Sequence, residues 1–251
     1  MTNDRKARAE RAETMRKDRE KAERKQRNMI SVAIVAVVVV LIGVAAWGIT
    51  SINKENKKND VVIEPRNLVD QSVPYVPAEN VVVAENAPVV EVFEDFLCPA
   101  CGQFDAYMGP TLKAAAEAGE IQLRFMPFSF LHNMSTNDYS HRAMNLAMCV
   151  VDEKGPEAFW DVKAALFANQ PAEGGPGPED DELLELAAGA GVTGIEACVT
   201  KQKFVPWIDE IKDTFSKERK ISGTPTMHIN GKESDARSPE DFATAVASAK
   251  K

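Results

Sequence analysis

Four stretches with different patterns of apolar and polar residues divide the chain of 251 residues. Residues 1–28 are mostly charged, residues 29–52 contain no charged residue, residues 53–78 are polar with several prolines, and residues 79–251 show helical and strand periodicities. A helix needs about 20 apolar residues to cross the hydrocarbon core of a bilayer. The pattern therefore predicts a charged leader, a transmembrane helix, a linker and one folded domain.

The apolar segment at residues 29–52 has a cleaved signal peptide as its alternative, with Val44 and Ala46 resembling a cleavage site. Signal peptides have apolar cores of about 7–15 residues behind a short basic start, whereas this segment is longer and follows 28 charged and polar residues. Eleven Lys or Arg precede the segment and three Lys follow it closely. This asymmetry predicts a single-pass protein of the cell membrane with a cytoplasmic N-terminus and an extracytoplasmic domain.

The domain is expected to begin with two apolar strands, at residues 80–84 and 87–96, separated by a turn. A helix is predicted from Cys101 to about Gly119, and residues 121–128 alternate as the next strand. A strand, a helix and a strand in succession predict a parallel pair of strands. The order of elements therefore indicates an α/β domain.

The second half of the domain is predicted to be helical over residues 137–218 and to return to strand structure afterwards. Asn230-Gly231 is a strong hairpin signal because both central positions of that turn need positive φ. Ser238 and Pro239 are typical of the start of a helix. The helical stretch is therefore an insertion between strands of one sheet.

Charge is distributed unevenly along the chain. Residues 1–28 hold eleven Lys or Arg against six Asp or Glu, a balance of +5 within a total of −8, so the remainder carries −13. An acidic body gives no reason to expect nucleic-acid binding.

Four cysteines carry the candidate chemistry. Outside the cytoplasm, an even number of cysteines is expected to pair. Cys149 and Cys198 both fall in the helical region, where they are expected to form a structural disulfide. Cys98 and Cys101 lie two residues apart between a strand and a helix, where they could form a redox couple, half of a metal site or a structural bridge.

The redox couple is favoured for Cys98 and Cys101. A metal site needs further ligands, and none of the three histidines has a suitable spacing: His132, His141 and His228. A bridge across two residues closes too short a loop to stabilise much. A cysteine at a helix start sees unpaired N–H groups that favour its thiolate. Cys98 is expected to be exposed, Cys101 buried, and Pro99 to occupy the first helical position.

The chain resembles the DsbA-like branch of the thioredoxin superfamily. The resemblance rests on "EDFLCPAC" after a strand, the helical insertion, and "SGTPTMHINGK" near the C-terminus, and it covers about residues 79–251. The charged leader and single span resemble membrane-tethered members from Gram-positive, particularly actinobacterial, cell envelopes. The resemblance implies a thioredoxin fold with an inserted helical subdomain.

The family also implies an activity, partners and roles for residues. It implies a thiol–disulfide oxidase that acts on reduced exported proteins, needs no cofactor or metal, and is reoxidised by a quinone-linked membrane partner. By position, Cys98 would be the attacked cysteine and Cys101 the buried resolving cysteine. Thr224 would pair with the substrate and precede a cis Pro225 beside the sulfurs.

Two departures from the family pattern limit these expectations. The acidic residue often found six positions before the first cysteine is replaced by Val92, although Glu91, Glu94 and Asp95 lie nearby. Asp95 is the candidate proton relay, with a solvated or capping role as its alternative. Ala100 offers the thiolate no donor, so the redox potential cannot be transferred from the family. His132 and His141 are expected either at the rim of the site or as ordinary surface or core residues.

Three functions remain open from the sequence. The first is an oxidase that introduces disulfide bonds, and the second is an envelope reductase or isomerase with the same cysteines. The third is a chaperone or scaffold that keeps the fold without catalysis. The reduction potential separates the first two, since oxidases lie near about −120 mV and reductases near about −270 mV.

Overall fold

The computed structural model describes residues 61–250. The expected leader, the expected transmembrane helix and the first part of the linker, up to residue 60, lie outside these residues. Within residues 61–250, no helix is long and apolar enough to cross a membrane.

A five-stranded mixed sheet, with its strands in the order β1-β3-β2-β4-β5, forms the centre of the domain. The strands are β1 Val73–Pro74, β2 Val89–Glu94, β3 Gln122–Pro127, β4 Thr226–Ile229 and β5 Lys232–Glu233. β2 and β3 are parallel, as the succession of strand, helix and strand predicts, and β4 runs antiparallel to β2. β2 is therefore the central strand, and its carboxyl end leads directly to the cysteine pair.

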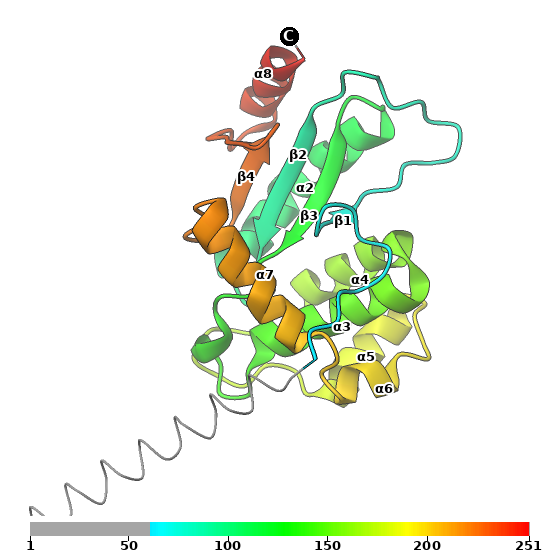
Figure 1. Cartoon of the computed structure of the whole chain (residues 1–251), viewed down its shortest axis with the longest axis vertical. Coiled ribbons are helices and arrows are strands. Elements are labelled where there is room, and N and C mark those ends of the chain that lie inside the picture. Colours follow the sequence, from blue (N-terminus) through cyan, green and yellow to red (C-terminus); the bar gives the residue numbers. More distant parts are fainter. Residues whose placement is uncertain (1–60, 251) are drawn as a thin grey trace, which may run out of the picture. The chain divides into compact units, whose positions relative to one another are not determined.

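Helices cover both faces of the sheet (Figure 1). Helix α2, Pro99–Glu117, and helix α8, Pro239–Ala249, pack against Val90 and Val92 of β2. Successive side chains of a strand point to opposite faces, and Phe93 meets Phe215 of helix α7, with ring centroids 5.2 Å apart. The central strand is therefore covered on both sides, as its nearly continuous apolar sequence predicts.

The expected helical insertion is present between β3 and β4. After a short 3₁₀ helix, η1 His132–Met134, it contains α3 Tyr139–Lys154, α4 Pro156–Ala168, α5 Asp180–Gly189, α6 Glu196–Thr200 and α7 Val205–Glu218. Helix α3 is buried along almost its whole length and forms the centre of this subdomain. Cys149 of α3 and Cys198 of α6 form a disulfide, which is the pairing expected from the sequence.

The expected strand at residues 80–84 is not formed, and this prediction is wrong. Val82 is 87% exposed, and the segment runs past Gly119, whose carbonyl accepts a hydrogen bond from the Ala84 N–H at 3.0 Å. The sheet edge beside β3 is occupied by β1 instead. The apolar run therefore lies beside Gly119, outside the sheet.

Residues 61–78, expected as the second half of the linker, contact the domain closely. Arg66 forms an ion pair with Asp152 at 2.9 Å, and the indole N–H of Trp160 donates to the carbonyl of Pro74 at 3.0 Å. Val73 is fully buried. The folded region among the described residues therefore begins before residue 79.

The hairpin and the last helix form as predicted. Asn230 and Gly231 have φ values of 50° and 74° between β4 and β5. The hydroxyl of Ser238 accepts a hydrogen bond from the Asp241 N–H at 3.2 Å, and Pro239 occupies the first turn of α8.

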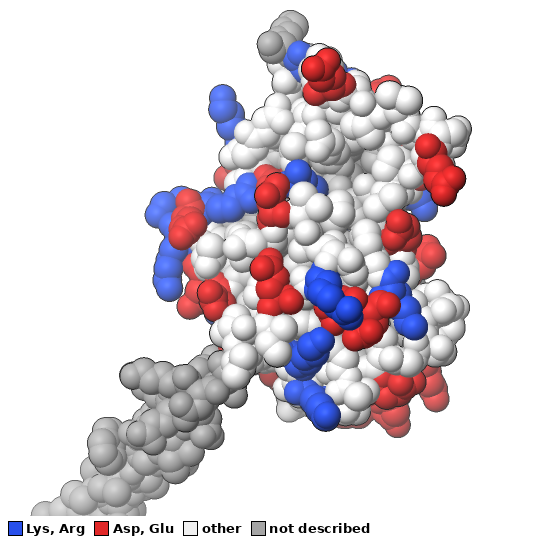
Figure 2. All heavy atoms as spheres, turned by 45° about the vertical axis from the view of Figure 1, so that its right-hand side comes forward, with Lys and Arg blue, Asp and Glu red and all other residues white. Residues whose placement is uncertain are grey.

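Acidic and basic side chains intermingle on the face of the molecule drawn in Figure 2. The exposed Asp70 also forms an ion pair with Arg124, at 2.7 Å. Such exposed pairs contribute little to stability.

Candidate active site

The cysteine pair lies where β2 ends and α2 begins. Cys98 is the N-cap residue of α2, with extended backbone angles, and Pro99 takes the first helical position. The N–H of Cys101 donates to the sulfur of Cys98 at 3.3 Å, so the sulfur occupies the place of an ordinary capping oxygen. Both cysteines are free thiols. This is the local geometry that the sequence predicts for a redox couple.

The environment lowers the pKa of Cys98 from 9.0 to about 6. The thiol of Cys101 has the largest effect, because its hydrogen bond stabilises a thiolate at Cys98. The Thr224 side chain and the backbone N–H groups of Cys101 and Ala100 act in the same direction, while partial burial opposes them. Within the described residues, the Thr224 hydroxyl has no conventional hydrogen-bond partner, which leaves it available to the sulfur.

The expectation that Cys98 is exposed is wrong, since the residue is only 5% exposed. Its sulfur lies 3.4 Å from the carbonyl oxygen of Thr224, on the loop before β4. The Thr224-Pro225 peptide bond is cis, as expected. The adjacent Pro99 and Ala100 are exposed, so the Cys98 sulfur lies just beneath the surface, covered by the loop.

Cys101 has the opposite electrostatic environment. It is fully buried, and burial raises the pKa of its thiol strongly. Its hydrogen bond to Cys98 and the negative charge of Glu94 raise the pKa further. The pair therefore combines one sulfur that is a stable thiolate near neutral pH with one that holds its proton.

Glu94 is the buried acid beside the thiols, a role that the sequence pattern did not indicate. It ends β2, its side chain is 2% exposed, and burial raises its pKa from 4.5 to about 7. Lys163 of α4 forms an ion pair with it at 3.0 Å and a second pair with Asp105 of α2 at 2.5 Å. One carboxylate oxygen, Oε1, has no hydrogen-bond partner in the part of the chain that the structure describes.

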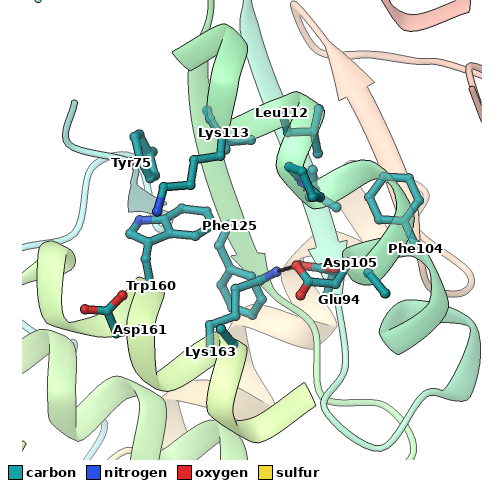
Figure 3. A pocket seen from close by; sticks show the side chains of 16 residues that line it. Tyr75, Glu94, Phe104, Asp105, Leu112, Lys113, Phe125, Trp160, Asp161 and Lys163 are labelled. Atoms are coloured by element: carbon teal, nitrogen blue, oxygen red, sulfur yellow. Dashed lines mark hydrogen bonds and ion pairs between the residues drawn. The ribbon is translucent and has the colours of Figure 1, made fainter. Parts of the chain in front are cut away.

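A cavity of about 390 Å³ lies between α2 and α4 on the Glu94 side of the sheet (Figure 3). Glu94, Asp105 and Lys163 meet at one end of it, and Tyr75, Trp160 and Lys113 lie at the other. Glu94, Asp105 and Lys163 therefore line the cavity. Glu94 also lies close enough to Cys101 for its charge to raise the pKa of that thiol.

Asp95, the candidate proton relay from the sequence, has a structural role. It is fully buried, and its carboxylate accepts hydrogen bonds from the N–H groups of Leu97, Phe130 and Leu131 and from the Ser140 hydroxyl, at 2.8–2.9 Å. Three of these donors meet Oδ2 and one meets Oδ1. Asp95 is therefore not solvated, and it holds the turn after β2 to the insertion.

The three histidines each pack against another ring. His132 and His141 stack with ring centroids 4.4 Å apart, and His141 pairs with Asp138 at 3.3 Å and with Asp209 at 3.4 Å. These two carboxylates raise the pKa of His141 to about 9 against the opposing effect of burial. His228 lies beside Phe93 on the face of the sheet away from Glu94.

Glu91 shows the alternation of side chains along β2. It lies on the opposite face of β2 from Glu94 and forms a bidentate pair with Arg219, one contact being 2.8 Å. Alternation therefore leaves Glu94 as the acid on the side of the thiols.

A protein-family model described as thioredoxin matches residues 77–248, and this chain belongs to that family. The chain is similar to the crystal structure of reduced DsbA from Mycobacterium tuberculosis, with 32% identity and a TM-score of 0.62 over 71% of this chain and 91% of that chain. It is also similar to reduced DsbG, a disulfide bond oxidoreductase from the same organism, with 32% identity and a TM-score of 0.63 over 72% and 88%. The resemblance to DsbA-like proteins is confirmed, and the fold is a thioredoxin fold with a helical insertion.

Curated relatives match more distantly. The serine/threonine-protein kinase PknE of Mycobacterium tuberculosis is 28% identical over 106 residues, which are 41% of this chain and 19% of the kinase. This chain therefore spans only about a fifth of that relative's length. The probable disulfide bond formation protein D of Bacillus cereus is 26% identical over 166 residues, 59% of this chain and 68% of that protein. The close structural relatives are thiol-disulfide oxidoreductases.

Proposed function

We propose that this protein is a membrane-anchored thiol–disulfide oxidase that introduces disulfide bonds into exported proteins. One observation carries the proposal: at the start of α2 the pKa of Cys98 is lowered to about 6 while that of Cys101 is raised. A sulfur with a low pKa is a good leaving group, and a buried thiol beside it can form or break a disulfide with it.

In the oxidised enzyme, Cys98 and Cys101 share a disulfide. A client thiolate attacks the Cys98 sulfur, the bond to Cys101 breaks, and the Cys101 sulfur leaves with the electron pair and takes up a proton. The second client thiolate then attacks the client sulfur of the mixed disulfide and releases Cys98 as a thiolate. The client gains one disulfide, and the enzyme gains two electrons.

Glu94 is suited to supply the proton that Cys101 takes up. Its pKa of about 7 keeps a substantial fraction protonated at neutral pH. Its charge acts on Cys101 directly, and Lys163 holds it in place. The Thr224 side chain is suited to stabilise the released thiolate. The Thr224 carbonyl, which accepts from the Cys98 thiol at 3.4 Å, is suited to bind the client backbone.

The electrostatics also favour the oxidising direction with a moderate driving force. Thioredoxin, with a cysteine pKa of about 7, has a potential of about −270 mV, and DsbA, with about 3.5, has about −120 mV. A Cys98 pKa of about 6 lies between these two values, which supports a potential more oxidising than that of thioredoxin. Structural disulfides of secreted proteins lie below about −300 mV, so transfer of the disulfide to such clients is favourable.

A reductase or isomerase is the second candidate, favoured by Ala100, whose side chain offers the thiolate neither a charge nor a donor. A potential near about −270 mV would support that direction. A chaperone or scaffold without catalysis gives no reason for a lowered Cys98 pKa.

We further propose that the domain is extracytoplasmic, anchored by residues 29–52, and reoxidised by a quinone-linked membrane partner. The charge asymmetry around the apolar segment supports this orientation, and the Cys149–Cys198 disulfide fits an oxidising compartment. External protease added to intact cells should cleave the domain. Protection in intact cells with cleavage only after lysis would contradict this placement.

The activity is tested by oxidation of a reduced exported protein that has two cysteines. The wild type should form the client disulfide, Cys98→Ser should abolish the reaction, and Cys101→Ala should accumulate the mixed disulfide. Gln103→Ala, an exposed change in the same turn of α2, is the matched control and should retain activity. Oxidation by Cys98→Ser at the wild-type rate would refute the proposed function.

A further inference from the structure

Gln170 connects the helical insertion to the cysteine pair. It lies two residues beyond the end of α4, and its side-chain amide nitrogen donates to the carbonyl oxygens of Phe96 and Cys98, each at 2.8 Å. These carbonyls stand on either side of Leu97, in the turn from β2 to α2. One amide group therefore holds both ends of the turn that presents the reactive sulfur.

Gly102 provides the space for this contact. A Cβ at Gly102 would lie 2.7 Å from the Gln170 side-chain oxygen, closer than real Cβ contacts allow. Gly102 lies within the first turns of α2, where glycine is intrinsically unfavourable and a positive φ is not required. Gln170 therefore occupies the space that the missing Cβ of Gly102 leaves.

We propose that Gln170 is a positioning residue for disulfide exchange, which holds the first turn of α2 so that its N–H groups point at the Cys98 sulfur. This inference rests on the proposed function. The residue touches neither sulfur, and it acts through the backbone of Phe96 and Cys98.

The geometry of the first turn makes such a restraint consequential. The Cys98 carbonyl accepts from the N–H groups of Cys101 and Gly102 at 3.0 and 3.2 Å, and Gln170 adds a third donor to it. The Cys101 N–H also reaches the Cys98 sulfur at 3.3 Å. Hydrogen bonds weaken steeply as the angle worsens, so a small rotation of the Cys98 peptide would weaken the stabilisation of the thiolate.

Two substitutions remove the donor in different ways. Gln170→Ala deletes the side chain, and Gln170→Met keeps a side chain of similar length that is uncharged and has no donor. Both should raise the Cys98 pKa by about 0.3–0.7 pH units, the range expected when part of a helix-terminus interaction is lost. Asn169→Ala, which removes only a local exposed bond to the Ala165 carbonyl, is the matched control and should leave the pKa unchanged.

The contact with Gly102 gives an independent test. Gly102→Ala alone should raise the Cys98 pKa because the new methyl group displaces Gln170. The double variant Gly102→Ala/Gln170→Ala should show no further rise beyond Gln170→Ala, because the steric conflict is gone. Additive effects of the two changes would contradict the inferred contact.

The measurement is thiolate absorbance against pH on the reduced full-length protein, with circular dichroism to verify folding. Gln170→Met nearly preserves the volume of the side chain without adding a charge, so it provides the reading if Gln170→Ala fails to fold. A wild type with a lowered pKa and folded Gln170 variants with the same pKa would overturn this inference alone. An ordinary cysteine pKa in the wild type would overturn the proposed function as well.

Discussion

Replacing Cys101 with alanine removes the contact that contributes most to the low pKa of Cys98, the hydrogen bond from the Cys101 thiol. With all contacts present the Cys98 pKa is about 6, against an ordinary value of 9.0. A hydrogen bond to a charged group contributes ~1.5–3 kcal/mol, which corresponds to about one to two pKa units. Cys101→Ala should therefore raise the Cys98 pKa to between about 7 and 8. It stays below 9.0 because the backbone N–H groups and Thr224 remain.

Thiolate absorbance of the reduced variant is a direct assay. Cys149 and Cys198 are joined in a disulfide and do not titrate, so Cys98 is the one titrating thiol in Cys101→Ala. Cys101→Ser is the matched control, since its hydroxyl can still donate and the rise should be smaller. A Cys98 pKa in Cys101→Ala equal to or below that of the wild type would refute the assignment of the Cys101 thiol as the main stabilising group.

Three further predictions concern stability. Burial raises the Glu94 pKa from 4.5 to about 7, so the folded state binds this proton more tightly than the unfolded state does. The free energy of unfolding should therefore fall by roughly 3 kcal/mol as the pH rises from the lower to the higher of these pKa values. Denaturant titrations across that range should show a flatter profile for Glu94→Gln, and an unchanged profile would contradict the shift. Asp152→Asn should destabilise the protein by roughly 1–2 kcal/mol near neutral pH, because Arg66 and Lys203 outweigh burial and hold the pKa of this carboxyl well below its usual range. Its difference from the wild type should disappear as the pH falls through that low pKa, and a deficit that persists in strong acid would indicate another cause. Replacing both Cys149 and Cys198 with alanine should lower the free energy of unfolding by roughly 2–4 kcal/mol, since the bridge joins residues 49 apart; an unchanged denaturation midpoint would contradict this.

The features that the sequence predicted correctly depend on local chemistry. Asn230-Gly231 predicts its hairpin because both residues tolerate positive φ, and they adopt 50° and 74°. Pro99 marks the first turn of α2 because its missing N–H has no partner to lose there. The cysteine spacing then places the Cys101 N–H and the Cys98 sulfur at one helix end. Each prediction needs only a few neighbouring residues.

The features that were missed depend on contacts between distant segments. Residues 80–84 have a strand-like composition, but the edge of β3 is taken by the two-residue strand β1, which is too short to give a sequence pattern. The burial of Cys98 comes from the Thr224 loop, 126 residues later in the chain. Periodicity therefore cannot predict either outcome.

The choice between neighbouring acids was also beyond the sequence. Glu94 and Asp95 are adjacent and both are buried. Glu94 lies on the side of the thiols and pairs with Lys163 of α4, whereas the carboxylate of Asp95 is bound by donors from the start of the insertion. Gln170 gives no signal at all, since its role depends on where α4 ends relative to α2.

Equilibrium redox titration of the full-length protein against glutathione tests the central claim most directly, namely that the start of α2 stabilises the reduced Cys98 enough to make the pair an oxidant. The lowered Cys98 pKa predicts a potential above that of thioredoxin, which is about −270 mV. A potential at or below about −270 mV would contradict it and would assign the protein to the reducing direction.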